Sequence, residues 1–355
     1  MINYGGGPAD NEIEITIFGP GYGEAIAVHL GEQNWMLVDS CLVPGTSEPA
    51  SRAYLEQIGV PASGVKAIIA SHWHDDHVRG ISTLAAHYAD AEFMLSHVFS
   101  DAEATAFLAA YSEKFAPGLS RGSKELYSAV KAREIVYFLH QRTSVLELTA
   151  NERNIRVCAL SPTPAACAQS IAHFASHVPK NPGIQIGHAP EMKPNLEAVV
   201  LHIDFVGDAV LLGSDLENHE ALGWSAVVND QWCANRPRSS AYKVAHHGSS
   251  TGDHPPVWAN MLNPNPVTCL TPYSLAGQYL PTSGDKSRIR DCTPHAYISS
   301  GASRRPSMDA AVLKRLNDIA TEVTVANPGF GAVRLRKVVG AQEWTREFFG
   351  AAGDL

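Results

Sequence analysis

Three histidines, two aspartates and a tryptophan lie together in the string His72-Trp73-His74-Asp75-Asp76-His77. In an extended segment His72 and His74 project to the same side, because they are two residues apart. Asp76 and His77 follow at a predicted helix start and can face a second point nearby. Imidazole and carboxylate ligands suit zinc, and also iron or manganese. The string therefore predicts two adjacent metal sites; a polar loop that is rich in histidine by chance is the alternative.

A buried strand is predicted to position this string. Val65–Ala70 is a continuous apolar run that leads directly into it, as expected for a strand covered on both faces. Glu12–Phe18 alternates polar and apolar residues, which is typical of a half-buried strand. The stretch around Gly207-Asp208 predicts a hairpin, and the Pro- and His-rich segment from Ser161 to Pro194 predicts irregular structure. Further predicted strands are Ile26–Leu30, Trp35–Val38, Glu92–Leu95, Val145–Leu148, Ile155–Leu160, Tyr242–Ala245, Val267–Thr271, Glu322–Ala326 and Gly331–Lys337, and predicted helices are Arg52–Ile58, Val78–Tyr88, 101–141 and Asp309–Ile319.

The order of these elements predicts an α/β fold. Strands dominate each half of the chain and helices fall between them, which favours two mixed sheets packed face to face with helices outside. The sequence shows no repeat, no low-complexity tract and no linker long enough to separate two domains. We therefore expect a single domain over residues 1–355.

Composition limits the class of protein. An apolar fraction of 45% and a charged fraction of 18% are ordinary for a globular protein. No run approaches 18 apolar residues and the first residues have no secretory pattern, so we expect a soluble, cytoplasmic protein without membrane association. The six cysteines form no CxxC pair, which predicts buried thiols rather than disulfides or a thiolate zinc site. A net charge of −9 argues against a long basic nucleic-acid surface, although a local basic rim remains open.

The HxHxDH string after a buried strand resembles the hallmark of the metallo-β-lactamase superfamily. This resemblance implies a four-layer αββα sandwich and usually two divalent metals, zinc first, bridged by a hydroxide. Asp215, after an apolar strand, matches the family's metal-bridging carboxylate. Asp39, at the end of WMLVDS, matches an aspartate that supports the metal histidines. A turn aspartate is the alternative for Asp39.

A second motif resembles one branch of this superfamily, the hydrolase domain of ComEC-type DNA-uptake proteins. His246-His247-Gly248-Ser249 follows a predicted strand, where the family places its last metal histidine. The segments GYGEA, LLGSDLE and MDAAVLKRL are also similar to that branch. The resemblance implies that His246 or His247 binds metal, while the other contacts the substrate or donates a proton to the leaving group. Spacing does not decide between them.

The chain also departs from the family pattern. Many members have a further histidine ligand between the two halves, and His173, His177 and His188 are the candidates, all in the segment predicted to be irregular. The branch tends to have an asparagine there, which Asn195 matches; an ordinary loop residue is the alternative. Glu217 could orient a histidine, or be solvated. Arg304 and Arg305 stand where the branch has a His-Pro, and could contact an anionic substrate or be solvated. Segments 101–141 and 273–303 are predicted insertions.

The predicted function is metal-dependent hydrolysis, in which an activated water attacks a phosphodiester. The substrate is then a small-molecule or nucleic-acid phosphodiester, and the protein a phosphodiesterase or nuclease with no obligate protein partner. Catalysis would involve Asp76, Asp215, His246 and His247. A second hypothesis is hydrolysis of an ester, lactone or amide, favoured if Trp224, Trp232, Trp258 and Tyr273 line an apolar pocket. A metal-containing binding or regulatory protein is the third.

Overall fold

We describe the chain from a computed structural model. The structure describes residues 2–19, 23–112, 120–150, 153–177, 194–205, 207–275, 277–301, 315 and 329–355. The predicted elements Asp309–Ile319 and Glu322–Ala326 lie outside these residues apart from Arg315, as do His188, Arg304 and Arg305.

Two large sheets form the centre of the molecule, and among the described residues each has eight strands. In spatial order the first sheet contains β17 (Thr345–Gly350), β16 (Gly331–Val338), β1 (Glu12–Gly19), β2 (Ala25–His29), β3 (Trp35–Val38), β4 (Val65–Ala70), β5 (Glu92–Ser96) and β6 (Tyr137–Leu139). The second contains β18 (Gly353–Asp354), β15 (Ala296–Ile298), β12 (Leu262–Leu270), β11 (Ser239–Lys243), β10 (Ala209–Leu212), β9 (Leu201–Phe205), β8 (Arg153–Ala159) and β7 (Ser144–Ala150). Strands β13 (Tyr273–Leu275) and β14 (Gln278–Leu280) form a separate antiparallel hairpin.

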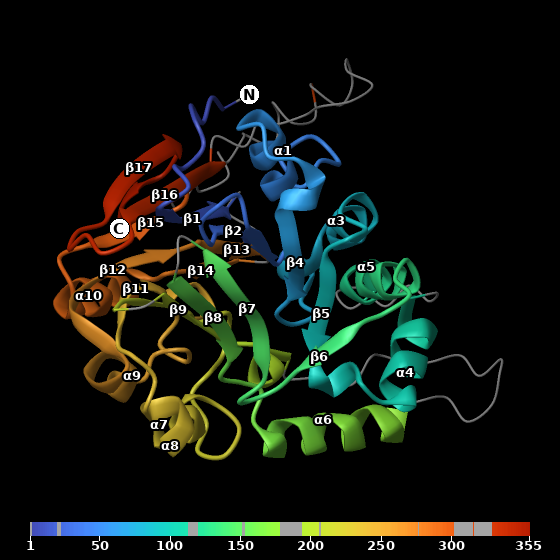
Figure 1. Ribbon diagram of the computed structural model, residues 1–355. Coiled ribbons are helices and arrows are strands. Elements are labelled where there is room, and N and C mark those ends of the chain that lie inside the picture. Colours follow the sequence, from blue (N-terminus) through green and yellow to red (C-terminus); the bar gives the residue numbers. More distant parts are fainter. Residues whose placement is uncertain are drawn as a thin grey trace.

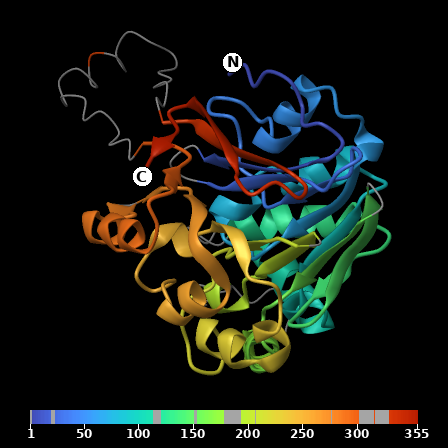
Figure 2. The same cartoon turned by 60° about the vertical axis from the view of Figure 1, so that its left-hand side comes forward.

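Helices cover the outer faces of both sheets. They are α1 (Ala50–Gln57), α2 (Asp75–Val78), α3 (Ile81–His87), α4 (Ala102–Ser112), α5 (Ser120–Lys131), α6 (Pro164–His177), α7 (Trp224–Asn229), α8 (Gln231–Ala234), α9 (Pro255–Asn260) and α10 (Ser283–Cys292). Figure 1 shows α3 to α6 on the right, beside β4 to β6, and α7 to α10 at the lower left. In Figure 2 the blue and red strands of the first sheet lie above the yellow and green strands of the second.

Alternation of side chains along the strands produces three large apolar cores among the described residues. In the first sheet Ile17 faces the second sheet, whereas Phe18 faces the helices outside. In the second sheet Leu212 faces the first sheet, whereas Leu211 faces α7 to α10. Each fully buried side chain of this size contributes roughly 1.5–3 kcal/mol of hydrophobic stabilisation. The arrangement is a four-layer αββα sandwich, which confirms the predicted fold class.

Three predictions of local structure were wrong. The stretch 101–141 was predicted to be helical, but Tyr137–Leu139 forms β6. The predicted helix Val78–Tyr88 is broken, because Gly80 adopts φ +79° and separates α2 from α3. The segment after Ser161 was predicted to be irregular, but Pro164–His177 forms α6. Its buried side is made mainly of small residues with Phe174 near the end, so the sequence shows no strong apolar periodicity. His173 and His177 therefore lie on a helix, where their rings stack at a centroid distance of 4.4 Å.

Two further expectations from composition concern membrane-spanning helices and disulfide bonds. In the part of the chain that the structure describes, no helix is long and apolar enough to cross a membrane. All six cysteines are free, and Cys292 is the one that is not fully buried. The single-domain prediction and the predicted insertions stay predictions; β6 lies within residues 101–141, and the β13–β14 hairpin lies within residues 273–303.

The topology brings several strand ends to one edge of the sandwich. Strands β3 and β4 run parallel, as do β10, β11 and β12. Parallel neighbours end at the same edge of a sheet, where ligands commonly bind in α/β proteins. The residues that follow these strands in the two sheets therefore lie close together, and they include the histidines and aspartates identified from sequence.

Candidate metal centre

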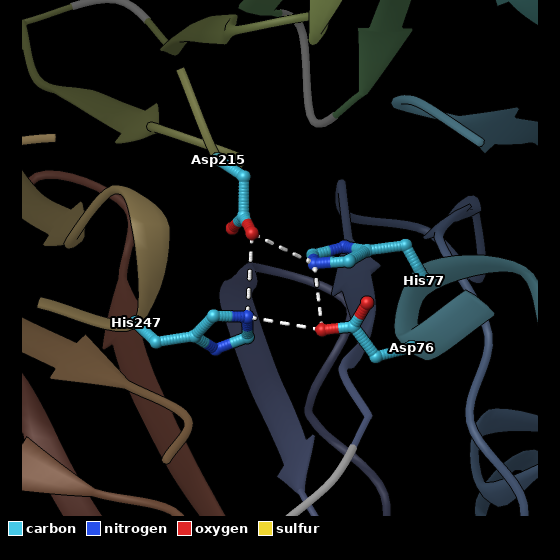
Figure 3. A group of neighbouring side chains, drawn as sticks. All are labelled: Asp76, His77, Asp215 and His247. Atoms are coloured by element: carbon cyan, nitrogen blue, oxygen red, sulfur yellow. Dashed lines mark hydrogen bonds and ion pairs between the residues drawn. The ribbon is translucent and has the colours of Figure 1, made fainter. Parts of the chain in front are cut away.

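The first cluster consists of Asp76, His77, Asp215 and His247, whose potential ligand atoms all lie within 4.8 Å of one another. Figure 3 shows the four side chains pointing toward a common centre. Nε2 of His77 is 3.2 Å from Oδ2 of Asp215, and Nε2 of His247 is 3.3 Å from the same oxygen. Nε2 of His247 is also 3.2 Å from Oδ2 of Asp76. Residues about 140 or more positions apart in the chain thus converge on one point.

The second cluster consists of His72, His74 and Asp215. Nε2 of His72 lies 4.0 Å from Oδ2 of Asp215 and 3.1 Å from Nδ1 of His74. Asp215 belongs to both clusters, so one carboxylate lies between two groups of imidazoles. The second cluster offers three side chains, whereas the first offers four.

Local backbone structure explains how the string near residue 72 serves two clusters. His72 lies two residues after the end of β4, and His74 is the extended residue that precedes α2. Asp76 and His77 lie in the single turn of α2, so the change from extended to helical backbone turns their side chains toward a different point. The predicted division of the string into two pairs of residues is the division that the geometry has.

Asp39 lies behind the first cluster. It is fully buried and accepts hydrogen bonds from the backbone nitrogen and the hydroxyl of Ser71, each at 2.7 Å. It also accepts a hydrogen bond from Nδ1 of His77 at 2.8 Å. This hydrogen bond fixes the ring so that Nε2 faces the cluster, which is how carboxylates commonly orient metal-binding histidines.

His246 and His247 take different places although they are neighbours. His247 is buried in the first cluster, whereas His246 lies at the wall of a cavity and belongs to no cluster among the described residues. Both have left-handed backbone conformations, with φ of 48° and 52°, and Gly248 follows with φ 80°. This conformation is uncommon for residues other than glycine, and it turns the two rings in different directions.

His246 is held by polar neighbours at this wall. Its Nδ1 is 2.8 Å from the hydroxyl of Thr251 and 3.3 Å from Oε1 of Glu217. Its Nε2 is 3.1 Å from Nδ2 of Asn195. Asn195 also donates to Oε1 of Glu217 at 3.0 Å. Asn195 and Glu217 therefore contact His246 and not the first cluster.

The electrostatic balance of the first cluster favours a bound cation. Burial opposes ionisation of His77, but the carboxylates of Asp215, Asp76 and Asp39 outweigh it and hold the pKa of His77 well above its usual range. Burial likewise opposes ionisation of Asp215, yet His247, His77 and Lys243 hold the pKa of Asp215 well below its usual range. The same carboxylates that attract a proton to the rings would attract a metal ion in its place.

The donor set fits a divalent metal. Nε2 of His77 and Oδ1 of Asp215 are buried without a hydrogen-bond partner. Buried polar atoms are usually satisfied; several others among the described residues also lack a hydrogen-bond partner, but these two belong to the first cluster. Imidazole nitrogen and carboxylate oxygen are zinc ligands, and manganese and iron accept the same combination. The residues present therefore fit a divalent metal at the first cluster, with the second cluster beside it.

A cavity of about 670 Å³ opens over these residues. Its floor includes Asp76, Asp215 and His247, and the β13–β14 hairpin forms part of its wall. Of the four aromatic residues proposed for an apolar pocket, Tyr273 lines the cavity. Trp224 is fully buried in the core beside the second sheet, and Trp232 and Trp258 pack against that core. Three of these four aromatic residues thus belong to or pack against the core, and Tyr273 is the one that lines the cavity.

Comparison with known proteins bears on this metal centre. A sequence model described as the Metallo-beta-lactamase superfamily matches residues 18–151, which include Asp39 and the whole string from His72 to His77. The part of the chain that carries this string is therefore similar to the metallo-β-lactamase superfamily. Members of this superfamily are largely metal-dependent hydrolases. No curated protein matches the sequence at a significant level.

Solved structures of the superfamily resemble this one distantly. The metallo-β-lactamase fold protein YhfI from Bacillus subtilis aligns at 13% identity over 65% of this chain and 69% of its own, with a TM-score of 0.32. A Cronobacter sakazakii metallo-β-lactamase with a HARLDQ motif aligns at 16% identity over 62% and 70%, with a TM-score of 0.33. AidC, a dizinc quorum-quenching lactonase, aligns at 14% identity over 56% and 58%, with a TM-score of 0.31. At this level the likeness carries no inference about substrate.

Sequence reasoning missed three residues around this candidate metal centre. Glu24, Lys243 and Thr271 are fully or almost fully buried around the first cluster. Glu24 is part of the GYGEA segment, which carried a resemblance but no assigned role. Lys243 offered a signal, because a lysine in the apolar strand before His246 and His247 requires a buried partner. Thr271 follows β12 and offered none.

Proposed function

We propose that this protein is a divalent-metal-dependent phosphodiesterase that acts on a small-molecule or nucleic-acid phosphodiester. The observation that carries the proposal is the place of Asp215, which is shared by the two clusters. Asp76, His77, Asp215 and His247 would hold one ion, and His72, His74 and Asp215 the other. Zinc is the metal that this set of nitrogen and oxygen donors favours.

Two ions at these positions would lower the pKa of a water molecule and neutralise the negative charge that develops on a phosphoryl group. The protein's own contribution is to fix the ligands and to exclude competing hydrogen bonds. Asp39 holds His77, and the neighbouring rings of His77 and His247 keep the carboxylates of Asp76 and Asp215 ionised although burial opposes it.

We further propose that His246, when protonated on both ring nitrogens, donates a proton to the leaving oxygen. Thr251 and Glu217 hold its Nδ1, so its Nε2 lies beside Asn195 at the cavity wall. An alkoxide leaves poorly from phosphorus without a proton, and a histidine at hydrogen-bond distance can supply one. We assign this role to Nε2 of His246, and the metal-holding role to His247.

Similarity of the HHGS and GYGEA segments to the ComEC-type branch supports phosphodiester over carbonyl substrates. A second function, hydrolysis of an ester, lactone or amide, is favoured by a different observation. The hairpin that lines the cavity presents two large apolar side chains, Leu275 at 44% and Tyr279 at 53% exposure. An acyl chain or aromatic ring on a small substrate could lie against them.

A parallel screen separates these functions. Protein reconstituted with zinc, manganese or iron is tested on bis-p-nitrophenyl phosphate, DNA, cyclic dinucleotides and lactones. We expect metal-dependent hydrolysis of at least one phosphodiester, lost in Asp215→Ala and kept in Asp291→Ala, which removes an exposed carboxylate on α10. Hydrolysis of lactones with no phosphodiester cleaved would replace the first function by the second. Full activity in Asp215→Ala would contradict both.

A further inference from the structure

A buried ion pair joins the two sheets beside the first cluster. Nζ of Lys243 is 2.7 Å from Oε1 of Glu24, and neither side chain is exposed to solvent. Glu24 directly precedes β2 in the first sheet, whereas Lys243 is the last residue of β11 in the second. The two residues are far apart in the sequence, and the edge of the sandwich brings them together.

Burying two charges is costly, and their mutual attraction often does no more than offset the loss of hydration. The presence of the pair is therefore not by itself evidence that it stabilises the fold. Its remaining contacts all lead toward the first cluster. Nζ of Lys243 donates to the backbone oxygen of Ser214 at 2.8 Å and lies 3.5 Å from Oδ1 of Asp215. The ammonium thus attracts one oxygen of Asp215, while the other oxygen faces His77 and His247.

The glutamate end of the pair reaches His247 through Thr271. The hydroxyl of Thr271 donates to Oε2 of Glu24 at 2.5 Å. Nδ1 of His247 lies 3.0 Å from that hydroxyl oxygen and 3.1 Å from the backbone oxygen of Thr271. In addition, the backbone nitrogen of Glu24 donates to the backbone oxygen of Asp76 at 2.9 Å. Three members of the first cluster are therefore contacted by this pair or by the threonine that it holds.

These contacts determine which nitrogen of His247 carries the proton. Thr271 has one hydroxyl hydrogen, and Glu24, which has none to give when ionised, takes it. Nδ1 of His247 then faces two oxygens that can only accept, so Nδ1 must be the donor. Nε2 is consequently the nitrogen left to bind a metal ion, and without a metal it donates to the carboxylates of Asp76 and Asp215.

We propose that Glu24 and Lys243 are positioning residues for the first metal: Glu24, through Thr271, sets the tautomer of His247, and Lys243 sets the orientation of the Asp215 carboxylate. The proposal rests on the metal-binding part of the proposed function and is independent of the substrate. It assigns to the buried pair a role in holding the ion rather than in holding the two sheets together.

The most conservative test removes only the hydroxyl of the connecting residue. Metal-free wild type, Thr271→Val and Thr271→Ser are titrated with zinc against a chromophoric chelator, without substrate. Loss of a group that orients a ligand commonly weakens metal binding about tenfold to a hundredfold. We expect a loss of that size at one of the bound ions in Thr271→Val, and recovery in Thr271→Ser. Nitrogen–proton NMR of the zinc-loaded protein should show a slowly exchanging Nδ1–H on His247 in wild type and Thr271→Ser, and a faster-exchanging one in Thr271→Val.

A second variant addresses the ion pair itself. Glu24→Gln combined with Lys243→Met removes both charges, so that neither is left buried without its partner. We expect this double variant to fold, as judged by circular dichroism and thermal melting of the metal-free form, and to bind zinc at least tenfold more weakly. If it does not fold, the Thr271 series decides.

Two outcomes separate this inference from the proposed function. Wild-type zinc affinity in both Thr271→Val and the folded double variant would overturn the positioning roles while leaving the metal centre intact. If wild type itself binds no divalent metal, the metal centre and the proposed function fail, and the positioning roles fail with them. If no tested substrate is hydrolysed, the conclusions from the two zinc titrations are unchanged.

Discussion

Nδ1 of His77 donates to the carboxylate of Asp39 over 2.8 Å, and both side chains are fully buried. Asp39 follows β3 and His77 lies in α2 after β4, so this hydrogen bond ties together two adjacent strand ends. It determines which nitrogen of His77 faces the first cluster, because the donor nitrogen cannot also bind a metal.

The first prediction concerns this hydrogen bond. Asp39 has a left-handed backbone with φ 59°, which asparagine tolerates better than most residues. Asp39→Asn should therefore fold, but its neutral amide holds the His77 ring less firmly. We expect zinc affinity to fall about tenfold to a hundredfold, measured by chelator competition. Unchanged zinc affinity would show that Asp39 stabilises the end of β3 and does not orient a metal ligand. Asp39→Ala should additionally lose stability, by on the order of 1 kcal/mol, from backbone strain.

The second prediction separates the neighbouring histidines. Both have positive φ, so asparagine is again the better replacement than alanine. His247→Asn should lose metal, measured by elemental analysis after dialysis. His246→Asn should keep its metal, while kcat falls about a hundredfold to ten-thousandfold, the range for loss of a general acid. His87→Asn, a partly exposed histidine of α3, is the control. Equal metal retention in the two site variants would contradict this division of roles.

The third prediction concerns the hairpin over the cavity. Tyr279 presents a half-exposed ring beside the floor of the site and has no place in the metal clusters. Tyr279→Ala should raise KM about fivefold to tenfold for substrates with an aromatic or acyl group, because such a ring contact contributes on the order of 1 kcal/mol. kcat should change little, since the contact is made equally in the ground state and the transition state. Tyr137→Ala, an exposed tyrosine of β6, should change neither constant. A fall in kcat with KM unchanged would argue against a binding role.

The fourth prediction concerns pH and stability. Burial raises the pKa of Glu197 from 4.5 to about 7, although hydrogen bonds from Ser170 and the Trp73 indole oppose the rise. The native state therefore holds this proton more tightly than the unfolded chain does. The protonated Glu197 carboxyl therefore adds about 3 kcal/mol to the free energy of unfolding below pH 4.5. This contribution is lost as the pH rises through 7.

Glu197→Gln removes this titration and keeps a side chain of the same shape. The stability of the variant relative to wild type should therefore increase between pH 4.5 and 7.5, measured by urea unfolding at several pH values. Glu92→Gln, an exposed glutamate at the start of β5, should show no such trend. A relative stability of Glu197→Gln that is independent of pH would mean that the carboxyl is ionised throughout.

Local patterns predicted much of the fold and of the metal ligands. Val65–Ala70 and Trp35–Val38 were predicted with the bounds that the strands have, because continuous apolar runs of strand length permit few alternatives. The string from His72 to His77 was informative because its ligands are neighbours in the sequence. The predicted αββα fold class was confirmed, whereas the ComEC-type branch stays a prediction.

Contacts between distant segments could not be predicted. Lys243 and Glu24 form an ion pair through the packing of two sheets, and nothing near either residue in the sequence indicates the other. Helix α6 was missed for a local reason, since small side chains such as Ala166 and Ser170 cover its buried side. The choice between His246 and His247 depended on a left-handed turn that two consecutive histidines do not favour.

The pairing of β1 with β16 affects the order in which the protein can mature. Glu12 is opposite Val338 and Gly19 is opposite Gly331, so β1 receives this neighbour only after most of the chain has been synthesised. Glu24 lies a few residues beyond β1, and its partner Lys243 also emerges late from the ribosome. A nascent chain therefore carries the histidine-rich string long before the residues that complete its surroundings. The first cluster can therefore form only once the chain has been synthesised beyond His247, well after the histidine-rich string.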